Sequence, residues 1–382
     1  MLKKHAFLSR IFFLPIQNVK EAAIVSGLDV YGVENLQEVI DFLEGKGTLQ
    51  PTIIDTRAEF NKSLDFPEFD FSDVRGQESI KRCMEIAAAG GHNIILIGPP
   101  GAGKTMLAKR LPSILPPMTL REALETTKIH SVAGKLKEVG LMNQRPFRSP
   151  HHTISNVALV GGGSYPQPGE ISMAHNGVLF LDELPEFKRD VLEVMRQPLE
   201  DREVTISRAK FTVTYPSSFM LVASMNPSPS GFFNDPDSPQ TSSPHEMQRY
   251  LSKISGPLLD RIDIHIEVTP VPFEKLSDDR KSECSIDIRK RVTAAREIQT
   301  SRFELMEKVH YNAQMSSKQI REFCALDEVS KQLLKTAMER LNLSARAYDR
   351  ILKVARTIAD LDAAETVVSS HIAEAIQYRS LD

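Results

Sequence analysis

The amino-acid sequence predicts an α/β protein with a parallel sheet, followed by a helical C-terminal region and preceded by a smaller α/β segment. Strand-length apolar runs alternate with helix-length amphipathic segments from residue 73 to about residue 269, which is the pattern of a parallel sheet with crossover helices. A glycine-rich turn, GPPGAGKT, joins one such run to one such helix. Beyond residue 284, apolar residues recur at helical spacing almost to the end of the chain.

The beginning of the chain predicts a small strand–helix–strand–helix segment. Its apolar spacing places strands at 12–16 and 28–33 and helices at 18–26 and 35–45. The opening stretch, MLKKHAFLSRIFFLPI, starts with the lysines of a secretory signal peptide. Because Arg10 interrupts its apolar part, we interpret it as a strand instead.

The glycine-rich turn has the pattern of a phosphate-binding loop. It follows the apolar strand IILI and leads into the helix MLAKRL, which is the context that GxxxxGK[ST] requires. Backbone N–H groups of such a loop and the helix N-terminus bind phosphates, so ATP with Mg²⁺ is the expected ligand. Lys104 is expected to reach the β- and γ-phosphates, and Thr105 to bind Mg²⁺. The residues expected to hold the nucleotide are Gly98, Pro99, Pro100, Gly101, Ala102, Gly103, Lys104 and Thr105.

Two later strands end in polar residues that belong with this loop. The strand VLFL ends in Asp182 and Glu183, and the strand FMLVASM ends in Asn226. Ligands bind at the carboxyl ends of parallel strands. We therefore expect Asp182 to hold Mg²⁺ and Glu183 to orient or deprotonate the attacking water. Asn226 can contact the γ-phosphate or that water, although asparagines at strand ends are also common turn formers.

A dense polar stretch, RPFRSPHHTIS, lies between the loop and the acidic strand end. The residues that follow it, GGGSYPQPGEIS, have the glycines and prolines of a sharply bent, protruding loop. Arg145, Arg148, His151 and His152 are candidates for gripping an anionic substrate or for acid–base catalysis, and a structural role is the alternative. A metal site is disfavoured because adjacent histidines point apart on an extended chain and no cysteine or acidic residue lies at ligand spacing.

A second candidate substrate element is DREVTISRAKFTVTYPSS, whose alternation predicts a β-hairpin. Arg202, Arg208 and Lys210 lie in or near it and are candidate contacts for a substrate, and a solvated charged hairpin is the equal alternative. Residues 227–244, just beyond the next strand, are low in complexity and predict a loop. In the helical region, Ser316 and Gln319 fit a capping box.

Composition narrows the class of protein. The formal net charge is −3, so any contact with a polyanion must come from a local patch. Three widely spaced cysteines argue against a disulfide framework and suit a reducing cytoplasm. No apolar run approaches the roughly 20 residues of a membrane helix. We expect a cytoplasmic protein that makes no membrane contact. Its expected parts are residues 1–48, a linker at 49–72, an α/β core at 73–270 and a helical lid at 271–382.

Taken together, the motifs resemble the AAA+ ATPases, and in particular the magnesium-chelatase-like ATPases of the YifB/ComM type. The matching stretches are VRGQESIKRCMEIAAAGGHNIILIGPPGAGKTMLAKRLP, the interval from RPFRSPHHTIS to VLFLDELPEF, QRYLSKISGPLLDRIDIHIEV and LSARAYDRILKVARTIADL. The resemblance runs from about residue 11 to the end of the chain.

This resemblance implies further roles, position by position. Asn226 matches sensor 1, and Arg261 in LLDRID matches the arginine finger that acts on ATP held by a neighbouring subunit. A structural salt bridge of Arg261 with Asp260 or Asp263 is the alternative. Arg346 in LSARAYDR matches the sensor 2 arginine, and the segment that ends at Gln77 matches the part that packs near the adenine.

The sequence departs from the family in two places. Many relatives carry a cysteine cluster after the sensor 1 asparagine, whereas this chain has NPSPSGFFNDPDSPQTSSP, so a zinc site there is not carried over. Relatives also begin with a longer domain that resembles part of the Lon protease fold. Residues 1–48 match only its last part, so we expect a truncated form or a shortened gene product, and no peptidase dyad is assigned.

The function that the resemblance implies is an ATP-hydrolysing motor that forms a homo-hexameric ring and acts on single-stranded or branched DNA. Its expected activity is branch migration or helicase-like processing of recombination intermediates during DNA uptake. A protein-remodelling chaperone with a protein partner is the alternative. A magnesium-chelatase-type motor subunit ranks last, because it needs a partner with a metal-dependent adhesion domain.

Overall fold

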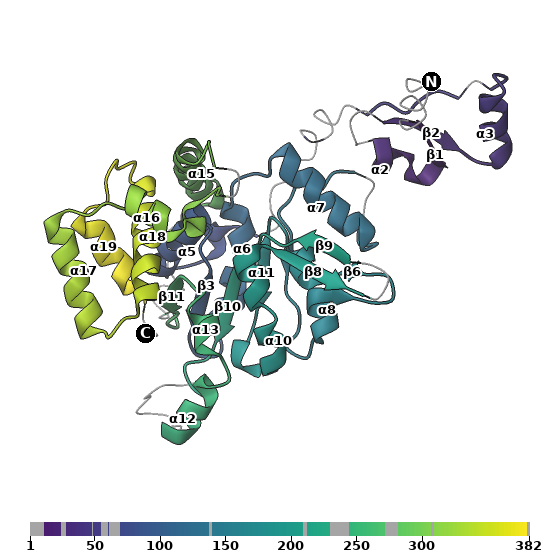
Figure 1. Cartoon of the computed structure of the whole chain (residues 1–382). Coiled ribbons are helices and arrows are strands. Elements are labelled where there is room, and N and C mark those ends of the chain that lie inside the picture. The colour runs from purple at the N-terminus through teal and green to yellow at the C-terminus, as the bar shows by residue number, and fades with distance from the viewer. Residues whose placement is uncertain are drawn as a thin grey trace. The chain divides into compact units, whose positions relative to one another are not determined.

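The structure is a computed structural model of the 382-residue chain (Figure 1). It describes residues 11–23, 28–47, 49–54, 60, 69–136, 140–208, 212–229, 244–271, 282–306 and 309–379. Contacts divide the chain into two compact units, each considered by itself: Met1–Asp65 with Met118–Gln144, and Phe66–Pro117 with Arg145–Asp382. The boundaries predicted at residues 48, 72 and 270 remain predictions.

The first unit contains a small parallel pair of strands. Its elements are β1 (Ile11–Pro15), η1 (Ile16–Asn18), α2 (Val19–Ala23), β2 (Asp29–Val33), α3 (Leu36–Leu43) and α7 (Leu120–Val132). The predicted order of strand, helix, strand and helix is confirmed, and β1 pairs with β2 from Ile11 opposite Asp29. Its core is thin, with Val19, Ala23 and Val30 buried. Residues 1–10 of the opening stretch MLKKHAFLSRIFFLPI lie outside the described residues.

The second unit is built on a sheet whose strands are all parallel, in the order β11-β3-β10-β7-β4. The strands are β3 (Ile94–Ile97), β4 (Phe147–Arg148), β7 (Val178–Leu181), β10 (Met220–Met225) and β11 (Ile264–Glu267). The central strands are apolar along their length because helices cover both faces of such a sheet. The predicted α/β fold class is confirmed.

Alternate residues of the central strands enter two different cores. Ile94, Leu96 and Phe180 pack with α5 (Glu78–Gly90), α6 (Lys104–Ile114) and the C-terminal helices. Their neighbours Ile95 and Leu181 pack on the opposite face. Side chains alternate across a strand, so one apolar run supplies both faces. The sheet is thereby fixed from both sides, and its carboxyl edge is a rigid base for a site.

Short helices and two antiparallel hairpins connect the strands. The hairpins are β5 (Gly161–Gly162) with β6 (Gln167–Pro168), and β8 (Glu203–Ser207) with β9 (Thr212–Pro216). The short helices are η2 (Phe71–Asp73), α8 (Asn156–Val160), α9 (Glu170–Met173), η3 (Leu184–Glu186), α10 (Arg189–Glu193), α11 (Arg196–Asp201), α12 (Pro244–Leu251) and α13 (Gly256–Leu259). The hairpin predicted before the sensor 1 strand is confirmed. Of the loop predicted at 227–244, residues 230–243 lie outside the described residues.

The C-terminal region is helical, as predicted. Its elements are α15 (Ser285–Arg302), η4 (Asn312–Gln314), α16 (Ser317–Phe323), α17 (Glu328–Arg340), α18 (Ala345–Leu361) and α19 (Ser369–Gln377). The predicted capping box is confirmed, because the Ser316 N–H donates to Gln319 Oε1 at 2.7 Å. Among the described helices, none is both long and apolar enough to cross a bilayer.

Candidate nucleotide-binding site

The glycine-rich loop leaves the sheet between β3 and α6. Gly101 and Gly103 have φ angles of +80° and +89°, which glycine adopts without the strain that a side chain would cause. A Cβ on Gly98 would lie 2.2 Å from the Val268 carbonyl oxygen, so the loop passes very close to the end of β11. These glycines allow the tight turn that brings α6 to begin at Lys104.

Lys104 joins the loop to the end of β10. Its Nζ donates to the Gly98 and Pro99 carbonyl oxygens at 2.6 and 2.9 Å, and to Asn226 Oδ1 at 3.2 Å. Burial lowers the pKa of the ammonium, and the negative charges of Asp182 and Glu183 oppose that shift. Two residues predicted from separate motifs are thus in direct contact. Their catalytic roles remain predictions.

A second set of contacts joins α6 to β7. Thr105 Oγ1 donates to Asp182 Oδ2 at 2.8 Å, and the Ser224 hydroxyl donates to Asp182 Oδ1. Mg²⁺ prefers oxygen ligands, such as those of a hydroxyl and a carboxylate, so these adjacent atoms fit the expected ion. Ser224 was not predicted. It lies two residues before Asn226 in β10, and a lone hydroxyl in such an apolar strand was the available signal.

Glu183 faces the polar stretch of residues 145–155. Its backbone is left-handed, with φ +54°, which is uncommon for a residue other than glycine. The N–H of Glu183 donates to Ser224 Oγ at 3.2 Å, and its Oε2 lies 3.7 Å from His152 Nδ1. The candidate water-activating carboxylate therefore contacts the stretch that carries candidate substrate residues.

The expectation that His151 and His152 point apart is wrong. Their ring centroids lie 4.1 Å apart, because the chain turns here and the Ile154 N–H bonds back to the His151 carbonyl at 3.0 Å. His151 Nδ1 is 2.9 Å from Thr153 Oγ1. Within the described ranges, no three His, Cys, Asp or Glu side chains gather as a metal ion would need.

The two arginines of the same stretch form hydrogen bonds and an ion pair within the second unit. Arg145 donates to the Pro116 and Asn176 carbonyl oxygens at 2.7 and 2.8 Å. Arg148 forms a two-pronged ion pair with Glu170, at 2.6 and 2.7 Å. These contacts favour the structural alternative for both arginines, since their guanidinium groups are already engaged within the unit.

The two hairpins contact each other. Arg208 Nε is 3.4 Å from the Gly163 carbonyl oxygen, and the Tyr215 hydroxyl donates to the Pro166 carbonyl at 2.8 Å. Gly163 and Pro166 lie in the bend between β5 and β6, as the sequence predicted for a protruding loop. Lys210, the other candidate contact, lies outside the described residues.

Gln77 lies beside the phosphate loop. It precedes α5 with a left-handed backbone, at φ +57°. Its Nε2 donates to the Ala102 and Thr269 carbonyl oxygens, both at 3.1 Å. The side chain therefore ties the segment expected near the adenine to the loop and to the chain after β11.

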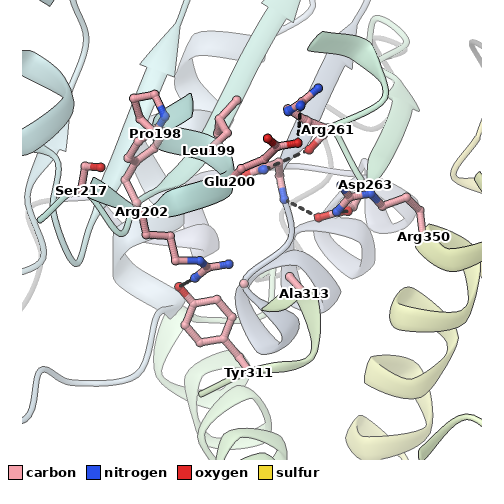
Figure 2. Close-up of a pocket in the computed structure, with 13 residues that line it drawn as sticks. Pro198, Leu199, Glu200, Arg202, Ser217, Arg261, Asp263, Tyr311, Ala313 and Arg350 are labelled. Carbon is pink, nitrogen blue, oxygen red and sulfur yellow. Dashed lines mark hydrogen bonds and ion pairs between the residues drawn. The ribbon is translucent and has the colours of Figure 1, made fainter. Parts of the chain in front are cut away.

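Arg261 and Arg346 occupy a different place from the loop. Arg261 forms an ion pair with Glu200 on α11 and donates to the Pro257 carbonyl, so neither carboxylate considered from the sequence is its partner (Figure 2). Arg346 on α18 pairs with Asp260 at 2.7 Å. In the described part of the chain, no hydrogen bond joins either guanidinium to Asp182 or Asn226.

A buried ion pair lies near Arg261 and Arg346, which together are called the arginine surface. Arg350 on α18 bonds to Asp263 at 2.6 Å, and Asp263 Oδ2 is 3.4 Å from His92 Nδ1. Burial favours a raised pKa for Asp263, but the charge of Arg350 and the hydrogen bond from His92 outweigh it and hold the pKa well below its ordinary value. This pair fixes α18 to the amino end of β11.

Comparisons with known proteins agree with this geometry. The family model described as magnesium chelatase, subunit ChlI, matches residues 70–276, and the model of the ChlI C-terminal region matches residues 282–379. Competence protein ComM of Haemophilus influenzae is 45% identical over 369 residues, which cover 96% of this chain and 70% of that protein. The YifB protein of Salmonella typhimurium is 43% identical over 374 residues, 98% of this chain and 72% of that protein. The Escherichia coli YifB protein is 45% identical over 369 residues, with coverage of 96% and 70%.

Proposed function

Because this chain belongs to the YifB/ComM branch of the magnesium-chelatase-like AAA+ family, we propose that it is an ATP-hydrolysing motor that forms a homo-hexameric ring and acts on DNA. The observation that supports this most is the separation of two sets of residues. Lys104, Asp182 and Asn226 meet at the phosphate loop, whereas Arg261 and Arg346 gather at another surface.

In the proposed reaction, this chain's residues bind, orient and accept a proton. Lys104 neutralises charge on the β- and γ-phosphates, and Thr105 and Asp182 hold Mg²⁺, which supplies further charge neutralisation when bound. Glu183 orients the attacking water and takes its proton, while Asn226 holds Lys104 Nζ at the carboxyl edge of the sheet. Gln77 lines the loop on the side proposed for the base.

The positions of Arg261 and Arg346 support the proposed hexameric ring. A guanidinium near the γ-phosphate stabilises the charge that develops in phosphoryl transfer. Arg261 lies at the end of α13 and Arg346 at the start of α18, and both contact carboxylates of their own subunit rather than the phosphate loop. They are therefore suited to complete the site of a neighbouring subunit.

DNA is proposed as the substrate from the name of the relative ComM, a competence protein, and from the paired hairpins. Arg208 on the β8–β9 hairpin meets the bend between β5 and β6. This is the place where we propose that a strand of DNA is gripped during branch migration or unwinding. The proposed site of action is the cytoplasm.

The test is ATP hydrolysis by the purified protein alone, with single-stranded DNA and with a four-way junction. Lys104→Ala and Glu183→Gln serve as controls that remove phosphate binding and water activation. We expect clear DNA stimulation that both variants abolish. The stimulated rate should also fall as salt rises, because phosphate contacts release counterions.

Hydrolysis that both variants abolish but that no DNA changes would contradict the DNA motor. That outcome would favour the protein-remodelling alternative, and a protein partner would then be sought. A monomer that hydrolyses ATP at the full rate would contradict the ring, because the arginines would then have no neighbouring nucleotide to act on.

A further inference from the structure

Glu200 lies at the end of α11 and contacts the candidate arginine finger. Arg261 Nη2 pairs with the Glu200 carboxylate, and Arg261 Nη1 donates to the Pro257 carbonyl oxygen at 2.5 Å. The Arg261 side chain is only 11% exposed, whereas that of Glu200 is 59% exposed. Both terminal nitrogens of the guanidinium are therefore fixed by the protein. Arg261 and Glu200 both line a small polar cavity of about 50 Å³, and Figure 2 shows the ion pair between them.

The turn that carries Glu200 is itself anchored. Arg202, two residues later, has a left-handed backbone at φ +58°. Its N–H bonds to the Pro198 carbonyl at 3.0 Å, and its carbonyl accepts from the Ser217 N–H at 2.7 Å. The β8 strand begins at the next residue, Glu203, so the turn joins the arginine surface directly to the β8–β9 hairpin.

Tyr311, just before η4, holds the Arg202 side chain. Arg202 Nη1 donates to the Tyr311 hydroxyl at 2.9 Å, and the ring lies between Arg202 and Arg296, whose guanidinium carbons are 5.3 and 4.3 Å from its centroid. The fit is close, since a Cβ on Gly91 would lie 2.4 Å from the ring. Burial favours a raised pKa for the phenol, but the charges of Arg202 and Arg296 outweigh it and lower the pKa.

We infer that Glu200 is a positioning residue that aims Arg261 at the nucleotide of the neighbouring subunit, and that the Arg202–Tyr311 contact steadies the turn on which Glu200 stands. This inference rests on the proposed ring ATPase. A cation lowers the barrier most when it is already in place as negative charge develops, because no reorganisation is then needed. Glu200 and the Pro257 carbonyl provide that fixed placement.

The same turn links the arginine to the hairpin. Arg202 directly precedes β8 and Glu200 pairs with Arg261, so this turn is covalently connected to the hairpin and ion-paired with the arginine. The structure thus gives a route by which contact at the hairpin changes the aim of Arg261. Tyr311→Phe tests this route, because it keeps the ring between the two guanidinium groups and removes only the hydroxyl.

The main variant is Glu200→Gln, which keeps the size of the side chain and removes its charge. We expect kcat for ATP to fall about tenfold with KM changed less than about twofold, since the lost interaction acts in the transition state. Glu193→Gln is the matched control: Glu193 pairs with Arg196 at 2.9 Å and lines an open groove together with Glu200 and Arg261, but no ion pair joins it to Arg261 among the described residues. Tyr311→Phe should lower the DNA-stimulated kcat about threefold, in the same direction.

Two further measurements separate positioning from a folding defect. Glu200→Gln added to Arg261→Ala should cause no further loss, because residues that act through one another are not additive. Mixing Glu200→Gln subunits with Lys104→Ala subunits should restore activity, since the second set supplies an intact Glu200–Arg261 pair to the first set's phosphate loop. Misfolded subunits would not be rescued.

A Glu200→Gln rate equal to that of the control, a rate above wild type, or an additional loss in the Arg261→Ala background would each overturn the inference. Failure of the proposed function is distinguishable, because Lys104→Ala would then hydrolyse ATP like the wild type. If Lys104→Ala is inactive and Glu200→Gln is fully active, only the role of Glu200 is wrong.

Discussion

The phosphate-loop edge, formed by Lys104, Asp182 and Asn226, and the arginine surface, formed by Arg261 and Arg346, hold their cations in different ways. At the loop, the Lys104 ammonium donates to the Asn226 side chain and to two loop carbonyls, while Asp182 accepts from Thr105 and Ser224. At the arginine surface, Arg261 and Arg346 each pair with a carboxylate of another element. The first set is proposed to hold a phosphate chain, whereas in the second set Arg261 is only 11% exposed and Arg346 is 66% exposed. Among the described residues no hydrogen bond or ion pair joins the two sets, which supports our proposal that each is part of a site completed by a neighbouring subunit.

The largest effect on hydrolysis is expected from Arg261→Ala, which tests whether the arginine surface takes part in the reaction. We expect kcat to fall about 1,000-fold, as for arginine fingers in other phosphoryl transfers, while nucleotide binding stays close to wild type. Binding is measured with a fluorescent ATP analogue, and the rate by phosphate release.

Subunit mixing is the control for this variant. Arg261→Ala and Lys104→Ala subunits, each inactive alone, should regain activity together, because one supplies the loop and the other the arginine. If the mixture stays inactive although it forms rings, Arg261 acts within its own subunit and the two-site comparison is wrong.

Within the arginine surface, a buried pair and an exposed pair should differ in stability. Asp263→Asn leaves Arg350 without its carboxylate in a buried place, and we expect a loss of about 3 kcal/mol in the free energy of unfolding. Asp260→Asn, whose partner Arg346 is 66% exposed, should cost less than about 1 kcal/mol. Chemical denaturation of both variants at neutral pH measures the difference. Equal losses would mean that the buried network does not anchor α18.

The pH dependence of that pair has a definite sign. The pKa of Asp263 in the folded protein lies below its ordinary value of 3.8. The contribution of the pair is therefore fully present above about pH 4 and is lost as the pH falls through the lowered pKa. Wild-type stability should fall more steeply than that of Asp263→Asn in this acid range.

The sequence predicted the loop edge far better than the arginine surface, and the reason is locality. GPPGAGKT, VLFLDE and the strand that ends in Asn226 each place a functional residue directly after a strand or before a helix. Parallel strands then bring those ends together without further information. Roles for these residues remain predictions, but their proximity followed from local patterns and the fold class.

The contacts that escaped prediction join distant parts of the chain. Arg261 meets Glu200 across 61 residues, and Arg202 meets Tyr311 across 109. No periodicity marks such pairs, and they depend on how α11 packs beside β8 and how η4 packs beside α18. The error over His151 and His152 was of a different kind, because an extended backbone was assumed where the chain turns.

The smallest effect is expected at the point where the loop edge meets the polar stretch. His152→Ala removes the only ring in that pair that contacts Glu183, at 3.7 Å, and should lower kcat about threefold with little change in KM, because the carboxylate is then less well oriented. His151→Ala is the matched comparison: its ring bonds Thr153, so its effect on basal hydrolysis should be smaller. Equal losses in the two variants would show that stacking of the rings matters rather than the contact with Glu183. A loss confined to His152→Ala would indicate that His152 orients Glu183. Residues 145–155 would then be the segment that connects a bound substrate with the proposed water-activating carboxylate.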